Sequence, residues 1–247
     1  MGMARQPYIF KEKDTGTIIL LGYEFNGIRK AGFCKFMKWY YQGFDLAQLL
    51  LQIDPLMTPH ADTQLTRLIS VDHEDLRVEL FNQYTSEDNA LIFDRIFYKV
   101  KGRIHVSHEY LIIPVTARNQ GLARKVLKAS LQQYLKMGVK MVHVLAGLSI
   151  GAYVWATHGY VAVNRSEMDN ILRRAGTELL PHQYLAVKAV YDSYYSIHPK
   201  GVAFPIHQWA DMEFMRVVLM NRESQWEGTL DLENEKQLRK FEKYVSK

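Results

Sequence analysis

Apolar side chains in the first quarter of the chain recur at the three- and four-residue steps of an α-helix. Between residues 33 and 44 this stripe is largely aromatic, which predicts one helical face that belongs to the core or to a docking surface. A second apolar stretch, DLAQLLLQI (45–53), predicts a further helix that ends at Pro55. Before both, TIILLGYEF (17–25) has the composition of a short strand. The residues of the stripe are Phe33, Phe36, Met37, Tyr40, Tyr41 and Phe44.

From residue 66 the apolar pattern changes to runs that are typical of strands. Three breaks separate four such runs. The breaks are too short for a helical crossover, so we expect neighbouring strands to be antiparallel and to form a meander. The runs are RLISVD (67–72), LRVELFNQ (76–83), ALIFDRIFYK (90–99) and RIHVSHEYLIIPV (103–115).

A long amphipathic helix is predicted after this meander. Its apolar positions step by three and one, and Gly138 stands where a left-handed residue would end the helix. The β-branched run VKMVHVLAG (139–147) then predicts a strand in the interior of a sheet. The apolar face of the helix consists of Ala123, Val126, Leu127, Ser130, Leu131, Tyr134 and Leu135.

The last third of the chain is predicted to be mainly helical, with a few extended pieces. The expected elements are a short helix at about 150–157, a strand in GYVAVN (159–164), a helix from Ser166 to Gly176, a helix from Pro181 to about Tyr195, extended pieces in EFMRVVLM (213–220) and WEGTLDL (226–232), and a C-terminal helix in 234–247.

These elements predict a mixed α/β (α+β) fold in which a mostly antiparallel sheet is flanked by helices. Residues 1–65 are expected to form a strand and helical preface packed on the core. Residues 66–232 form the core itself, with a helical insertion at about 166–212, and residues 233–247 form a C-terminal helix.

Composition and charge narrow the class of protein. The chain has 247 residues and a formal net charge of +5, spread along its length. This balance permits an anionic ligand such as a nucleotide-bearing cofactor, and permits a nucleic acid without indicating one. No apolar run is long enough for a transmembrane helix, and the N-terminus lacks the apolar centre of a secretory signal, so we expect a cytoplasmic protein with no membrane partner.

Metal sites are not expected. The chain has one cysteine, Cys34, which excludes an intramolecular disulfide and a cysteine-based zinc cage. His105 and His108 are an odd number of residues apart in a predicted strand, so they point to opposite faces and do not form a ligand pair.

The junction RNQGLARKVL (118–127) between the last strand of the meander and the long helix has the composition of an anion-binding turn. Backbone N–H groups in the first turn of a helix have no intrahelical partner and point outward at the positive end of the helix dipole, which stabilises phosphates. Gly121 and Ala123 are small enough to let a phosphate approach the backbone. Arg118 and Arg124 would add charge-assisted hydrogen bonds.

With its flanking strands, the GV pair after the helix and the later HGY (158–160), this turn resembles the GNAT superfamily of N-acetyltransferases. The resemblance is clearest over residues 92–164, extends less clearly over 66–232, and includes a weaker similarity to an uncharacterised bacterial and phage-type subgroup. It implies that acetyl-CoA is the cosubstrate and that its pantetheine arm pairs with the backbone of residues 112–115, which include Ile113 and Val115. The implied pyrophosphate contacts are Arg118, Gln120, Gly121, Leu122, Ala123 and Arg124.

In this family the general base often projects from the strand before the turn. Strand alternation places His105, Ser107 and Glu109 on one face, and His108 and Tyr110 among apolar residues on the other, unless a bulge shifts the register. Glu109 is therefore the first candidate base, and His108 is the alternative.

The family's usual tyrosine acid lies four residues before the glycine of a GF or GY pair, and that position holds Trp155 in this chain. Trp155 would then lie beside the cofactor. Tyr153 is two residues away and so points to a different side of the helix. Three interpretations stay open: water protonates the leaving thiolate, Tyr153 reaches it through a distorted helix, or the protein is a weak or inactive enzyme.

The resemblance implies an acetyl-CoA-dependent N-acetyltransferase with an unknown amine acceptor. Two alternatives stay open. The first is a toxin or effector that acetylates a macromolecule, such as an aminoacyl-tRNA or a protein. The second is a non-catalytic interaction module that binds acyl-CoA. The sequence leaves homodimer formation undecided.

Overall fold

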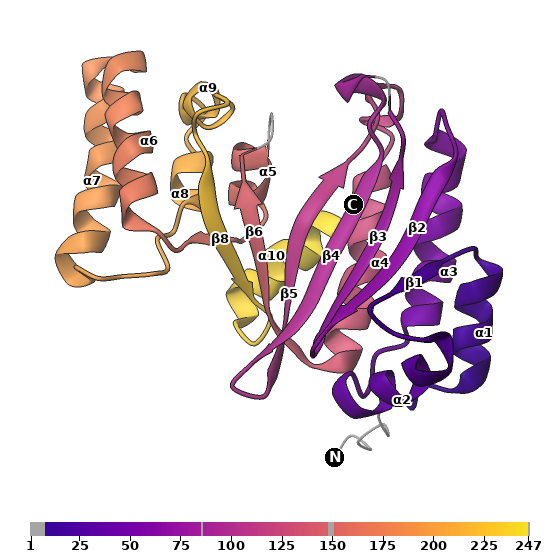
Figure 1. Cartoon of the computed structure of the whole chain (residues 1–247). Coiled ribbons are helices and arrows are strands. Elements are labelled where there is room, and N and C mark those ends of the chain that lie inside the picture. Colours follow the sequence, from indigo (N-terminus) through magenta and orange to yellow (C-terminus); the bar gives the residue numbers. More distant parts are fainter. Residues whose placement is uncertain (1–7, 85, 148–150, 247) are drawn as a thin grey trace. The chain divides into compact units, whose positions relative to one another are not determined.

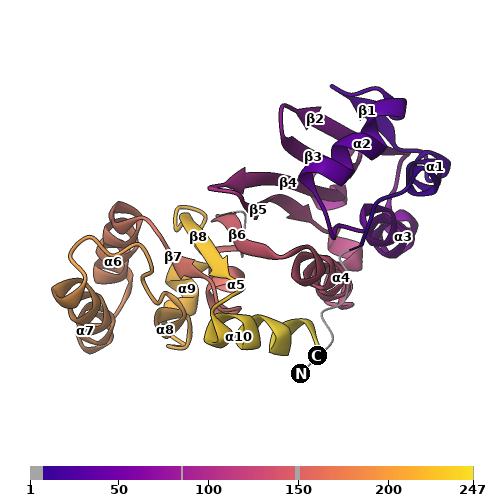
Figure 2. The same ribbon diagram turned by 90° about the horizontal axis from the view of Figure 1, so that it is seen from below.

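The computed structural model describes residues 8–84, 86–147 and 151–246. The chain divides into two compact units, Met1–Lys140 with Val245–Lys247 and Met141–Tyr244, which are described separately below. Figures 1 and 2 together label their helices and strands. The domain ranges expected from the sequence do not coincide with these units and stay a prediction.

The first unit contains a meander of strands whose neighbours are antiparallel, as predicted, with one added parallel edge strand. The β4–β5 connection is a tight turn in which Lys101 (φ 52°) and Gly102 (φ 75°) are both left-handed, a geometry that matches the twist of the paired strands. In spatial order the strands are β1 (Glu24–Asn26), β2 (Leu65–Asp72), β3 (Asp75–Asn82), β4 (Ile92–Val100) and β5 (Arg103–Ile112).

Helices cover one face of this sheet, and Figure 2 shows them gathered on that side. The aromatic stripe predicted from the sequence packs into the core there: Phe33 and Phe44 are fully buried, and the Tyr41 hydroxyl donates a hydrogen bond of 2.7 Å to the carbonyl of Phe97 on β4. The helices are α1 (Glu12–Leu20), α2 (Lys30–Tyr40), α3 (Leu46–Met57) and α4 (Leu122–Met137), with short 3-10 turns η1 (Thr58–His60), η2 (Glu87–Asn89) and η3 (Val115–Ala117).

Two predictions for the N-terminal region are wrong in part. Most of the segment 17–25 is not a strand, because the Asp14 side chain accepts a hydrogen bond of 2.6 Å from the Lys11 N–H and starts helix α1 ahead of it. Only β1 at its end is extended. Pro55 lies inside the last turn of α3 and does not end it. The bond that proline cannot donate would go to the carbonyl of Leu51, which is an exposed residue.

The second unit combines three strands, paired antiparallel, with the C-terminal helices. The segment 213–220 forms helix α9, not the predicted strand, because Met215, Val218 and Leu219 recur at helical spacing and are fully buried. The strands, in spatial order, are β6 (Val139–Ala146), β8 (Trp226–Asp231) and β7 (Val161–Ala162). The helices are α5 (Gly151–Thr157), α6 (Arg165–Glu178), α7 (Pro181–Ile197), α8 (His207–Ala210), α9 (Met215–Leu219) and α10 (Glu235–Val245).

The start of α6 differs slightly from its prediction. Asn164 is the N-cap, and its side-chain oxygen accepts a hydrogen bond of 3.1 Å from the Ser166 N–H. Gly176 lies within the helix, where the ring of Tyr184 on α7 packs so closely that an added Cβ would lie 3.3 Å from it. This glycine therefore permits close packing of α6 and α7 and is not a stop signal.

The predicted fold class is confirmed at the level of a mixed α/β protein with mostly antiparallel strands. Across the described ranges, no helix combines the length and the apolar character that crossing a membrane requires.

Candidate functional site

Two left-handed residues turn the chain into helix α4. Asn119 has a φ of 63° and Gly121 a φ of 77°, and α4 begins immediately after Gly121. Glycine adopts this conformation without steric cost, and asparagine tolerates it better than most residues. The residue types of the turn thus match its backbone shape.

The start of α4 leaves backbone donors directed outward. The first helical hydrogen bond runs from the Lys125 N–H to the Gly121 carbonyl, at 3.1 Å. The N–H groups of the three residues before Lys125 precede that bond. Because the N-cap is a glycine, it has no side-chain oxygen with which to accept from them. The 16-residue helix carries no acidic residue in its first turn, so its positive end favours an anion.

The side chains that the sequence assigns to this turn take different roles. The Arg124 guanidinium lies against the turn, since a Cβ added at Gly121 would be 3.3 Å from its Nη2. Arg118 Nε donates to the Ile113 carbonyl at 3.0 Å, and Gln120 Nε2 donates to the Thr116 carbonyl at 2.8 Å. Leu122 is buried and anchors the helix, whereas Ala123 is partly exposed.

The strand before the turn is shorter than predicted. It ends at Ile112, so Ile113 and Val115 lie beyond it, the first buried and the second exposed. Pro114 has no N–H to pair, and Val115 starts the 3-10 turn η3. The prediction that 112–115 is a continuous strand is therefore wrong.

A β-bulge decides which way the candidate bases face. Arg95 pairs with His108 and Asp94 pairs with Tyr110, which leaves Glu109 as the extra residue. His108 points into the core and is 5% exposed, whereas Glu109 is exposed and accepts a hydrogen bond of 2.5 Å from the Ser107 hydroxyl. Tyr110 is 44% exposed, so the prediction that it shares the apolar face of His108 is wrong beyond the bulge.

A buried arginine holds this bulge. Arg95 is fully buried, and its Nη1 donates to the carbonyls of Asp94 (2.6 Å) and Tyr110 (2.7 Å). Its guanidinium also lies 4.6 Å from the ring centroid of Phe93. The role of Arg95 was not predicted, although a basic residue inside the apolar run ALIFDRIFYK was a signal for it.

His108 is tied to the helix behind the sheet. Its Nε2 is 2.9 Å from the hydroxyl of Tyr134 on α4, and both residues are buried. Burial raises the pKa of the Tyr134 phenol, while the nearby positive charge of Arg95 partly opposes the shift. The two candidate bases thus occupy opposite faces of β5, and Glu109 is the one that solvent reaches.

We expect the Arg95 contacts to contribute measurably to stability. Replacing Arg95 by Met would leave the buried carbonyl of Asp94 and the partly buried carbonyl of Tyr110 without their donor, at a cost of about 2 kcal/mol in the free energy of unfolding. The matched control is Lys128→Met on the exposed face of α4, with a change within about 0.5 kcal/mol. Urea unfolding followed by circular dichroism measures both. Equal stability of the two variants would contradict the assigned role of Arg95.

Tyr153 and Trp155 belong to the second unit, on helix α5. The ring of Tyr153 lies 5.7 Å from the guanidinium of Arg216, and the ring of Trp155 packs edge-on against Tyr160 at 5.2 Å. Their predicted roles beside the leaving thiolate stay predictions.

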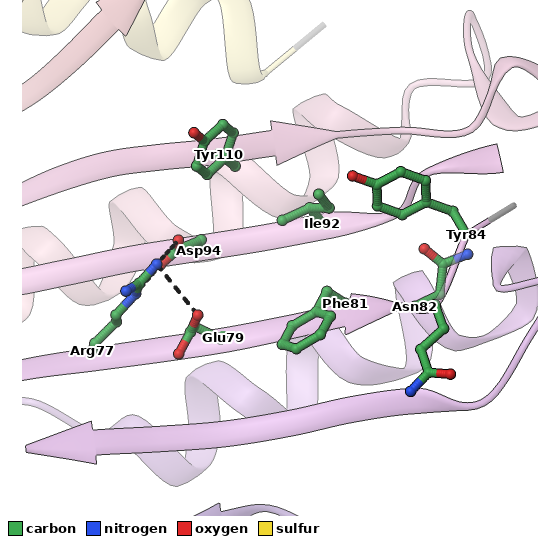
Figure 3. Close-up of a pocket in the computed structure, with 9 residues that line it drawn as sticks. Arg77, Glu79, Phe81, Asn82, Tyr84, Ile92, Asp94 and Tyr110 are labelled. Atoms are coloured by element: carbon green, nitrogen blue, oxygen red, sulfur yellow. Dashed lines mark hydrogen bonds and ion pairs between the residues drawn. The ribbon is translucent and has the colours of Figure 1, made fainter. Parts of the chain in front are cut away.

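In the first unit, the face of the strands opposite to the helices carries a hollow of about 420 Å³, lined by β3, β4, β5 and the loop after β3. Figure 3 shows its side chains on the near face of the sheet with the helices behind. Alternation along β3 produces this arrangement: Leu76, Val78 and Leu80 are buried in the core, and Arg77 and Glu79 point the other way. The alternate positions of Arg77 and Glu79 were the signal in the sequence for a charged face of this strand.

No protein-family model, no curated protein and no solved structure matches this chain.

Proposed function

We propose that the chain is an acetyl-CoA-dependent N-acetyltransferase with a GNAT-like core, which transfers an acetyl group to an amine acceptor. The observation that carries the proposal is the glycine turn before α4. Outward backbone N–H groups, the positive end of a 16-residue helix and the adjacent Arg124 side chain converge there, a combination suited to a pyrophosphate.

The strand before the turn supports the same reaction. In N-acetylation the acceptor nitrogen bonds to the acetyl carbon, the C–S bond breaks, and the CoA thiolate leaves. An ammonium acceptor must first lose a proton, and Glu109 is an exposed carboxylate on a bulge of the strand that leads into the turn. Bulges are frequent beside active sites because they redirect a side chain out of the ladder. Glu109 is therefore our assignment for the base.

Calorimetry with acetyl-CoA tests the cosubstrate half of the proposal. Arg124→Gln should weaken binding about ten- to a hundredfold, because a charge-assisted hydrogen bond contributes about 1.5–3 kcal/mol. Lys128→Gln is the matched control: it removes the same charge one helical turn further on, about 6 Å along the axis, and should bind as the wild type does.

Release of free CoA with a panel of primary amines tests the transfer itself. Absence of acetyl-CoA binding to the wild type would overturn the proposal. Binding without release of CoA in the presence of any amine would indicate the non-catalytic module instead.

A further inference from the structure

The positive and negative charges of the side chains in the hollow, on the open face of the sheet, are unequal in number. Arg77 forms two hydrogen bonds with Asp94, from Nε to Oδ1 (3.0 Å) and from Nη2 to Oδ2 (2.6 Å). Glu79 Oε1 lies 3.3 Å from the same Nη2. Arg77 thus pairs with two carboxylates, and Figure 3 shows the side chains of Asp94 and Glu79 pointing toward it. The charged groups that line the hollow carry one negative charge in excess.

Of the two carboxylates, Glu79 is the one that can pair with a further cation. Asp94 is 4% exposed and already takes both bonds of the arginine fork, whereas the Glu79 side chain is 17% exposed and has a single, longer contact. Burial raises the pKa of the Glu79 carboxyl despite the opposing effect of Arg77. A cation placed beside it would compensate for the water that this carboxylate has lost.

Aromatic rings provide the walls. Phe81, Tyr84 and Tyr110 all line the hollow, and the two tyrosines are 46% and 44% exposed. Aromatic faces attract organic cations, and together with a carboxylate they select a positively charged group attached to an apolar body.

The hollow is also close to the assigned base. Tyr110 follows Glu109 directly in the chain. The negative charge of Glu109 is among the groups that raise the pKa of the Arg77 guanidinium, after Asp94 and Glu79. A ligand held between Glu79 and Tyr110 would therefore lie on the same face of the sheet as Glu109.

We propose that this hollow binds a small organic amine in its protonated form, between the Glu79 carboxylate and the rings of Phe81, Tyr84 and Tyr110. It would be the acceptor subsite of the transferase, and in that respect the inference rests on the proposed function.

Direct binding of a probe amine tests the site without acetyl-CoA. Benzylamine, which is protonated at pH 7, is compared by NMR titration with benzyl alcohol and benzoate, which have nearly the same shape but are neutral or negative. We expect benzylamine to bind about tenfold more tightly than the alcohol and benzoate more weakly still, with shifts in the amides of β3 and β5. Equal affinity for amine and alcohol would overturn the inference.

Variants locate the effect. Glu79→Gln keeps the shape of the side chain and should weaken benzylamine binding about tenfold. The control Glu74→Gln, in the exposed β2–β3 turn, should leave it unchanged. Phe81→Leu should also weaken benzylamine binding. It tests the site independently if Glu79→Gln disturbs the ion pair with Arg77. Wild-type affinity in both hollow variants would refute the site.

The outcomes separate this inference from the proposed function. If benzylamine binds through Glu79 but no amine releases CoA from acetyl-CoA, the cation site stands and the transferase fails. If amines are acetylated with the same kcat/KM by the wild type and by Glu79→Gln, the transferase stands and the hollow is not its acceptor subsite.

Discussion

Replacing Gly121 by Asp should abolish measurable binding of acetyl-CoA, a loss of at least about a hundredfold. Two effects act together. The new carboxylate would repel the pyrophosphate at the helix start, and the left-handed backbone at φ 77° would be strained by any Cβ. Arg124 would also be drawn toward the new carboxylate, because an added Cβ already lies 3.3 Å from its Nη2. Isothermal titration calorimetry against the wild type measures the loss.

The control for this variant is Gly138→Asp at the other end of the same helix. Gly138 has a φ of 70°, and an added Cβ there meets no atom within 4 Å, so the two variants share the conformational strain and differ in the site. We expect Gly138→Asp to lower stability by about 1–2 kcal/mol and still to bind acetyl-CoA. If both variants lose binding equally, the effect comes from the helix as a whole, and the turn loses its assigned role.

Those parts of the fold that depend on short-range patterns could be predicted from the sequence. The meander β2 to β5 follows from apolar runs joined by short turns, and α4 follows from its apolar steps and its terminal Gly138. A local pattern fails when packing decides between two elements. The run 213–220 has the residues of a strand, but its burial at helical spacing requires the neighbouring helices of the second unit.

Only those parts of the candidate site that depend on residues close together in the sequence could be predicted. Gly121 and its helix start could be recognised because residue type and backbone conformation are coupled within a few positions. The face of β5 on which Glu109 and Tyr110 lie could not be predicted reliably. It depends on a bulge, which is set by the pairing of two strands and by the buried Arg95 that contacts it. The hollow was not predicted as a whole, because Arg77 and Glu79 of β3 line it only together with residues of β4 and β5.

Replacing Glu109 by Gln should lower kcat about a hundredfold or more with the amines that the wild type acetylates. The amide keeps the size of the side chain and the hydrogen bond from the Ser107 hydroxyl, but it cannot take the ammonium proton. Acetyl-CoA affinity should not change. Glu87→Gln, an exposed carboxylate on η2, is the control and should keep wild-type turnover. The measurement is release of free CoA, with calorimetry on the same samples.

His108→Gln separates the two candidate bases. His108 is 5% exposed and bonded to Tyr134 behind the sheet, so its loss should reduce the free energy of unfolding by about 1–3 kcal/mol and leave most of kcat intact in the folded fraction. The opposite pattern, with His108→Gln folded but inactive and Glu109→Gln active, would move the base to the buried face. That result would require the acceptor amine to reach the Tyr134 side of β5, which the exposed position of Glu109 argues against.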